Sequence, residues 1–133
     1  MKRTFLYAKL HQATVTQADL NYEGSFSIDE ELLQVSGIQE NEQIHVLNIT
    51  NGQRFITYAI KAPRNSRMMC ANGACAHLVN IGDRVIICAY AEFDTHELSH
   101  WEPTVLFLDQ NNDYKIKHTQ RLEEASDTTI EMA

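Results

Sequence analysis

The pair Gly24-Ser25 is the feature of this sequence that most directly suggests covalent chemistry. The hydroxyl of Ser25 can attack the carbonyl carbon of the residue before it, and Gly24 has no Cβ to resist the strained backbone that this N-to-O acyl shift requires. The resulting ester could lose the Ser25 α-proton and release the Gly24 carboxylate, leaving a dehydroalanine that hydrolyses to a pyruvoyl group and ammonia. Gly-Ser is also common in ordinary turns, so the pair alone leaves both interpretations open.

Three cysteines offer a second kind of chemistry, but their number and spacing favour free thiols. An odd count in a chain without a secretion signal disfavours a disulfide framework. Cys70 and Cys75, with His77, lack the C-x2-C pairs and four ligands typical of zinc sites, so no metal is predicted. Cys75 lies among small residues and is a candidate nucleophile, whereas Cys88, inside an apolar run, is predicted to be a buried small hydrophobic residue.

One face of a predicted strand gathers a cation and a weak acid. In the run 53–62, Arg54, Ile56 and Tyr58 are spaced two residues apart and therefore share a face, while Thr57 points to the opposite one. A cation and a phenol on one face could form the wall of a pocket, although an exposed arginine and a half-buried strand tyrosine are the ordinary alternatives.

The elements that must position these residues are mostly short strands. The runs 43–50 and 53–62 are joined by Asn51-Gly52, a pair that predicts a β-hairpin because both residues can adopt positive φ. Further extended segments are predicted at 5–10, 13–16, 68–71 and 84–91, a short helix at 29–37, a helical turn at 95–100, and a second hairpin from 103–109 and 114–118.

Many short strands, few helices and no βαβ alternation predict a mainly β domain, a small mixed barrel that closes to remove exposed strand edges. The 133 residues correspond to one domain, which we place at residues 1–118. Residues 119–133 are acidic and lack a sustained apolar pattern, so we predict a mobile tail there.

Composition disfavours two classes of partner. A net charge of -7 and a pI near 5.2 would repel a phosphate backbone, so no nucleic acid partner is predicted. No apolar run approaches the roughly 18 residues of a membrane span, and the first residues lack an apolar signal core. We therefore expect a cytoplasmic protein that binds no membrane.

Several motifs together resemble one family, the bacterial aspartate 1-decarboxylases, which use a pyruvoyl group to make β-alanine for pantothenate. The resemblance runs in order from about Met1 to about His118 without a large gap. The matching motifs are Lys9-Leu10-His11, Val15-Thr16-Gln17-Ala18-Asp19-Leu20, Tyr22-Glu23-Gly24-Ser25, Asn48-Ile49-Thr50-Asn51-Gly52, Arg54-Phe55-Ile56-Thr57-Tyr58-Ala59-Ile60 and Asn72-Gly73-Ala74.

The resemblance implies a double-psi β-barrel with short helices, assembled as a homotetramer with active sites between subunits. It further implies a proenzyme that cleaves itself between Gly24 and Ser25 into chains 1–24 and 25–133. Ser25 would become the pyruvoyl cofactor, whose ketone condenses with the amine of L-aspartate and accepts electrons as the α-carboxylate leaves. Whether another protein assists this maturation is left open.

The same resemblance implies roles for particular side chains. Arg54, through its bidentate fork, and Lys9 would hold the substrate β-carboxylate. Tyr58 would donate the proton that follows CO2 loss. Thr57 would assist self-cleavage near Gly24, although strand alternation places it on the face opposite Tyr58.

Asn72, with the backbone N–H groups of Gly73 and Ala74, would form a cradle for an oxyanion or carboxylate. The alternative for this segment is an ordinary Asn-Gly turn. His11 and Tyr22 are further candidates around the cleavage site, with local hydrogen bonding as their alternative role.

Two residues depart from the family pattern. Leu47 replaces a tryptophan that often lines the pocket, and Cys75 replaces an alanine after Ala74. Leu47 and Ile86 would supply an apolar wall near the departing carboxylate; for Ile86, core packing is an equal alternative.

The main alternative function is an unprocessed β-barrel that serves as a binding or assembly module, because small barrels host unrelated functions. A swapped-hairpin DNA-binding barrel is disfavoured by the net charge and by the lack of a basic cluster.

Overall fold

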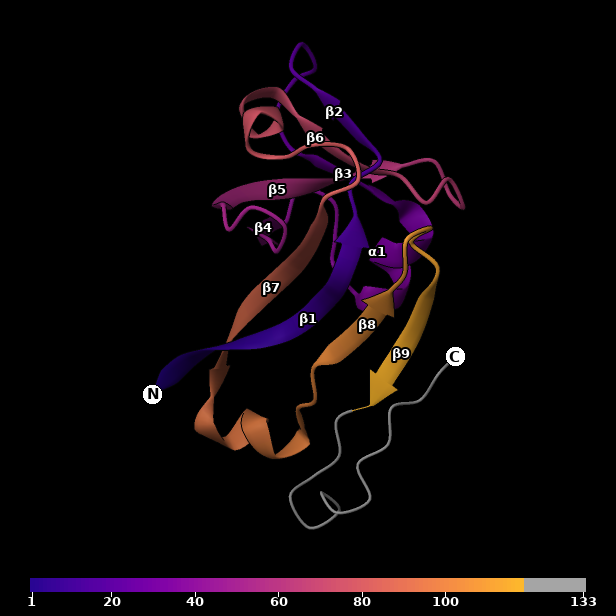
Figure 1. Cartoon of the computed structure of the whole chain (residues 1–133). Coiled ribbons are helices and arrows are strands. Elements are labelled where there is room, and N and C mark those ends of the chain that lie inside the picture. The colour runs from indigo at the N-terminus through magenta and orange to yellow at the C-terminus, as the bar shows by residue number, and fades with distance from the viewer. Residues whose placement is uncertain (119–133) are drawn as a thin grey trace.

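The computed structural model describes residues 1–118, which form a mainly β structure with a few short helical segments (Figure 1). This confirms the predicted mainly β fold with short helices. The tail predicted at 119–133 lies outside the described residues. The strands are β1 (Lys2–Thr14), β2 (Gln17–Asp19), β3 (Phe26–Asp29), β4 (Gln43–Asn48), β5 (Arg54–Ala62), β6 (Met69–Asn72), β7 (Arg84–Asp94), β8 (Thr104–Leu108) and β9 (Tyr114–His118).

The nine strands follow the order β2-β6-β3-β5-β4-β7-β1-β8-β9, so neighbours in the sheet are often distant in sequence. Three neighbouring pairs are parallel, namely β1 with β8, β2 with β6, and β3 with β5. The remaining pairs are antiparallel, and the longest of them joins β1 and β7, which lie side by side in Figure 1. The extended segment predicted at 84–91 is confirmed as β7, which is paired on both edges.

β1 is one strand where the sequence predicted two. Its pairing with β7 shifts register between Leu6 and Ala8 and again between Leu10 and Ala13. Gln12, in the second irregularity, has φ +63°. A bulge adds a residue without ending the strand, and this explains why the local pattern suggested a break.

The predicted hairpin of β4 and β5 is confirmed, but its turn is longer than two residues. Gly52 has φ +79°, whereas Asn51 does not adopt positive φ. The Asn48 side chain instead accepts hydrogen bonds from the N–H groups of Thr50 (2.9 Å) and Asn51 (3.3 Å). An Asx-type turn therefore replaces the expected tight one.

Three short helical segments connect the strands: α1 (Glu30–Ser36), η1 (Gly73–Leu78) and η2 (Thr95–His100). The short helix predicted at 29–37 is confirmed as α1; the Asp29 side chain caps it by accepting from the N–H of Glu31, and Gly37 ends it with φ +86°. η2 confirms the predicted helical turn. No helix within residues 1–118 is long and apolar enough to cross a membrane.

A buried carboxylate fixes the far end of β3. Asp29 is fully buried and accepts hydrogen bonds from the N–H groups of Glu31 (2.8 Å), Asn65 (3.0 Å) and Arg67 (2.7 Å). Its Oδ2 also lies 3.3 Å from Nη1 of Arg67. Burial alone would raise the pKa of the Asp29 carboxyl, but these donors and the Arg67 charge together lower it.

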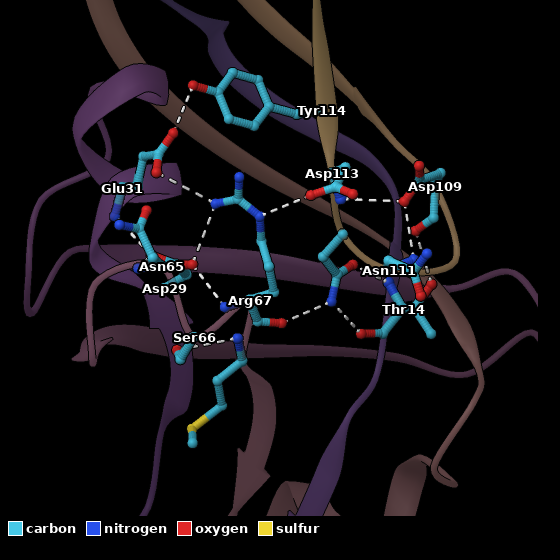
Figure 2. Close-up of polar contacts among 12 residues, drawn as sticks. Thr14, Asp29, Glu31, Asn65, Ser66, Arg67, Asp109, Asn111, Asp113 and Tyr114 are labelled. Carbon is cyan, nitrogen blue, oxygen red and sulfur yellow. Dashed lines mark hydrogen bonds and ion pairs between the residues drawn. The ribbon is translucent and has the colours of Figure 1, made fainter.

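Arg67 extends this cluster to the hairpin of β8 and β9. Figure 2 shows its guanidinium between Asp29 and Glu31 on one side and Asp113 on the other. Nε of Arg67 lies 3.1 Å from Oδ1 of Asp113, and the Arg67 carbonyl accepts from Nδ2 of Asn112 at 2.9 Å. The start of α1, the segment before β6 and the last hairpin are therefore tied together at one point.

We predict that Asp29→Asn lowers the free energy of unfolding by about 2 to 4 kcal/mol, because it leaves buried donors without their charged acceptor. Asp113→Asn, which changes an exposed partner of the same arginine, should cost less than about 1 kcal/mol. Urea denaturation of both variants at matched concentration measures the difference. Equal losses in the two variants would show that burial of Asp29 carries no special weight.

The effect should also depend on pH. The lowered pKa of Asp29 means that its contribution is complete above the ordinary aspartate pKa of about 4 and is lost as pH falls through the lower folded value. The gap between wild type and Asp29→Asn should therefore stay constant from about pH 7 to about pH 5 and close only in stronger acid.

Candidate active site

Ser25 has an unusual backbone conformation in a buried position. Its φ is +98°, well outside the region that a non-glycine residue ordinarily adopts, and the residue is only 3% exposed. Its carbonyl oxygen accepts a hydrogen bond from the N–H of Asn72 at 2.9 Å. That bond continues the antiparallel pairing of β3 and β6, in which Phe26 faces Ala71. The sheet therefore holds Ser25 in a conformation of high local energy.

Gly73 packs directly against Gly24. A Cβ on Gly73 would lie 3.1 Å from Cα of Gly24 and 3.2 Å from the carbonyl oxygen of Tyr22, and Gly73 itself has φ +68°. Close approach and backbone conformation both require glycine here. The segment predicted as a small-residue loop is the 3-10 helix η1, which begins at Gly73 and leaves Ala74 exposed.

The Asn72 side chain is buried and anchored within the site. Its Nδ2 donates to Oγ of Ser27 at 2.8 Å and lies 3.4 Å from Oγ of Ser25. Its Oδ1 accepts from the thiol of Cys70 at 3.1 Å. The amide thus orients the Ser25 hydroxyl, and Ser27 and Cys70 are two contacts that sequence reasoning missed.

Cys75 also reaches Ser25. Its Sγ lies 3.4 Å from the carbonyl oxygen of Ser25 and 3.2 Å from that of Asn72. Burial raises the pKa of the Cys75 thiol above its ordinary value. The sulfur therefore keeps its proton at neutral pH, which favours a hydrogen-bond donor over the nucleophile considered from the sequence.

β5 brings a second side chain, that of Tyr58, close to Gly24. The Tyr58 hydroxyl lies 3.8 Å from where a Cβ on Gly24 would be. Thr57 is on the opposite face of β5. β3 and β5 are parallel, and Phe26 pairs with Ala59. If this register continued two residues upstream, Gly24 would lie level with Thr57. Both residues can therefore face the cleavage segment despite strand alternation.

Lys9 and Arg54 lie on the outward face of β1, β7, β4 and β5, the face of β5 that also carries Tyr58. Lys9 pairs with Cys88, Cys88 with His45, and His45 with Ile56, so these side chains form one row across four strands. Directly paired residues point to the same side of a sheet, so this row and Arg54, two residues from Ile56, share that side.

The outward face carries exposed apolar groups. Ile56 is 58% exposed, Tyr58 41% and Tyr90 39%. Leu47 and Ile86 face each other in the pairing of β4 and β7, and both are partly buried. They join the same face, because Leu47 also pairs with Arg54.

His45 and Tyr90 belong to this face and were missed from the sequence. Their rings meet edge to face with centroids 5.0 Å apart. Burial and Cys88 raise the pKa of Tyr90, and the nearby charge of Arg54 opposes that shift. Alternation on β4 could have identified His45, because it is two residues from Leu47 on a predicted strand.

The remaining candidates around the cleavage site are His11 and Tyr22. His11 packs on Phe107 of β8, with ring centroids 5.3 Å apart, and burial together with Lys9, Lys117 and Arg84 lowers its pKa. Within one chain its ring therefore contacts β8, and its role around the cleavage site stays a prediction. The Tyr22 side chain is exposed, and only its carbonyl oxygen closely approaches Gly73.

Three findings limit what this arrangement can hold. No group of three His, Cys, Asp or Glu residues within residues 1–118 is placed to bind a metal ion. All three cysteines are free. A cleft of about 500 Å³ opens beside Asn72, lined also by Ser27, Cys70 and Tyr22, but its lining does not include Ser25, Tyr58 or Arg54.

Comparison with known proteins gives a consistent result. The family model described as aspartate decarboxylase matches residues 1–115. The aspartate 1-decarboxylase of Maricaulis maris is 54% identical over 84% of this chain and 93% of its own length. The enzyme of the same name from Caulobacter vibrioides is 56% identical over 84% of this chain and 95% of its own length. The enzyme from Wolinella succinogenes is 49% identical over 89% of this chain and 98% of its own length.

Among solved structures, the computationally designed protein msDPBB_sym2 matches 64% of this chain and 96% of its own length. Its TM-score is 0.39 at 16% sequence identity, a likeness too distant to support an argument.

We predict that Gly73→Ala disturbs Gly24 in a way that Gly52→Ala does not. Both glycines have positive φ, so both variants carry similar backbone strain, but only at Gly73 would the new Cβ meet another backbone. Cleavage at Gly24-Ser25 should slow roughly tenfold or more in Gly73→Ala and proceed normally in Gly52→Ala. Intact-mass measurement over time follows both proteins, and equal rates would show that the close packing on Gly24 is not required.

Proposed function

The chain belongs to the aspartate decarboxylase family, and its reaction is the decarboxylation of L-aspartate to β-alanine and CO2; we propose that it works through a pyruvoyl group made from Ser25. The observation that carries this proposal is the backbone of Ser25, which is buried, held with φ +98° and preceded by a glycine. Strain stored at a buried serine favours chemistry at the peptide bond before it, because cleavage releases that strain.

The residues present fit a cofactor formed at this position. Ser25 supplies its atoms, Asn72 and Cys75 contact the Ser25 carbonyl that would become the amide carbonyl of the group, and the Tyr58 hydroxyl lies close to Gly24. The pyruvoyl ketone supplies the electron sink that decarboxylation of an amino acid at its α-carbon needs. This assignment also predicts the two product chains, 1–24 and 25–133.

The substrate would be held by its charges. Arg54 offers two parallel donors for a carboxylate, and Lys9 adds a second positive charge on the same outward face. Thr57 would act in processing, and the backbone of Gly73 and Ala74 would border the substrate. The apolar surface of Leu47 and Ile86 would keep water from the departing carboxylate.

A homotetramer with sites between subunits belongs to the same proposal. The row from Lys9 to Ile56 spans three strand spacings, roughly 14 Å, so the two cations lie far apart for one small substrate within a single chain. Exposed Ile56 and Tyr90 on the same face support a contact surface there. A second copy packed there would bring further cations toward Arg54 and would cover the apolar groups.

Location in the cytoplasm is also proposed. It is supported by the three free thiols, which are typical of a reducing compartment.

We expect Ser25→Ala to remain one intact chain without decarboxylase activity, because no hydroxyl is left to form the ester. Ser27→Ala is the matched control, since its hydroxyl accepts a bond from the same Asn72 amide but has no role in the cleavage. Mass measurement and an assay for β-alanine test both variants. Cleavage of Ser25→Ala at the same bond would contradict the proposal, whereas Ser27→Ala should still yield two chains.

Tyr58→Phe should separate maturation from turnover. The variant keeps the ring, so the chain should still cleave, but aspartate turnover should fall roughly 10²- to 10⁴-fold if the phenol donates the proton that follows CO2 loss. The loss should appear in kcat rather than KM, measured on fully cleaved protein.

Tyr114→Phe provides the comparison for Tyr58→Phe. Its hydroxyl bonds Glu31 at the opposite end of β3, away from Ser25. It should leave turnover unchanged. Turnover of Tyr58→Phe within a few-fold of wild type would assign the proton to water or another group.

A further inference from the structure

The carbonyl oxygen of Ser25 faces two hydrogen-bond donors. One is the N–H of Asn72 at 2.9 Å, and the other is the thiol of Cys75, whose Sγ lies 3.4 Å away. Ser25 is almost fully buried, so these donors act in a site where water provides little competing solvation. Two donors converging on one carbonyl oxygen form the geometry of an oxyanion hole.

Negative charge develops on this oxygen in one particular step of the proposed maturation. In the acyl shift, charge gathers on the carbonyl of Gly24, because that is the carbon under attack. In the following elimination, water takes the α-proton of Ser25, and the C–H electron pair moves toward the Ser25 carbonyl. The pair then expels the Gly24 carboxylate as the Cβ–Oγ bond breaks, and water converts the dehydroalanine to a ketone with release of ammonia.

The Cys75 thiol is suited to respond to that charge. It has one hydrogen and two acceptors, the carbonyl oxygens of Asn72 at 3.2 Å and Ser25 at 3.4 Å. Before elimination both acceptors are neutral amide oxygens, and the nearer one, of Asn72, competes well for the thiol hydrogen. Once Ser25 gains charge it becomes the stronger acceptor, so the thiol bond strengthens in the transition state more than in the ground state.

We propose that Cys75, together with the N–H of Asn72, stabilises the charge on the Ser25 carbonyl oxygen during elimination, and that Cys75 is therefore a catalytic residue of self-maturation. The inference rests on the proposed function, because the step exists only if Ser25 matures. It assigns a role to a residue that departs from the family pattern.

The ester that precedes elimination has two fates, and their ratio provides the readout. Elimination gives chain 25–133 with a pyruvoyl end, whereas hydrolysis gives the same chain with an N-terminal serine, heavier by one ammonia. Intact-mass measurement of freshly made precursor over time follows both products and the uncleaved chain. This readout needs no substrate and no assay of decarboxylation.

In Cys75→Ala, pyruvoyl formation should slow about 3- to 10-fold, the usual effect of losing one hydrogen bond, and the share of N-terminal serine should rise. Cys75→Ser retains a donor and should restore the wild-type rate and ratio. Cys88→Ala, which removes a thiol from β7, is the matched control and should behave as wild type. If Cys75→Ala does not fold, Cys75→Val, which fills the space without a donor, should show the same slowing.

Two results would overturn the inference. Pyruvoyl formation in Cys75→Ala, or in Cys75→Val where that variant replaces it, at the wild-type rate and ratio would show that the thiol is not used. Equal slowing in Cys75→Ser would show that packing, rather than a donated hydrogen, is what matters. Absence of any cleavage in the wild-type chain would instead refute the proposed function itself, so the two failures are distinguishable.

Discussion

The antiparallel pairing of β3 and β6 is the constraint on which the rest of this structure depends. At one end, the N–H of Asn72 holds the carbonyl of Ser25, and at the other, Asp29 receives three backbone donors and the charge of Arg67. Ser25 directly precedes β3, so it cannot relax without breaking its bond to Asn72 or shifting the register of the strand. The Asp29 cluster supports that register from the other end of β3.

This arrangement separates two tasks within one small domain. Backbone groups of Asn72 and Gly73 contact Ser25 and Gly24, whereas the charged side chains Lys9 and Arg54 lie on the outward face of β1 and β5. β5 serves both, since Thr57 and Tyr58 point to opposite sides of it. Under the proposed function, maturation would depend on the fold of one chain, while substrate binding would depend on a surface that a second copy completes.

Local features of the sequence predicted much of the fold. The short helix α1, the hairpin of β4 and β5, and the shared face of Arg54 and Tyr58 follow from spacing and residue type within a few positions. Residue type also indicated that Gly24-Ser25 could undergo an acyl shift, and the family resemblance turned this possibility into a specific expectation of a pyruvoyl group.

Contacts between distant segments could not be predicted in this way. Asp29 and Arg67 are 38 positions apart, and Cys75 lies 50 positions from Ser25. The row from Lys9 to Ile56 needs the register of three strand pairs. Such contacts arise from sheet order, which hydrophobic periodicity does not encode.

The most direct test of the central claim is the intact mass of the purified wild-type protein, followed by reaction with a hydrazine that labels ketones. If Ser25 matures to a pyruvoyl group, the protein consists of two chains, 1–24 and 25–133, and the longer one lacks a free N-terminal amine and takes up one hydrazine. A single chain of 133 residues, or a longer fragment beginning with serine that takes up no hydrazine, would contradict this maturation.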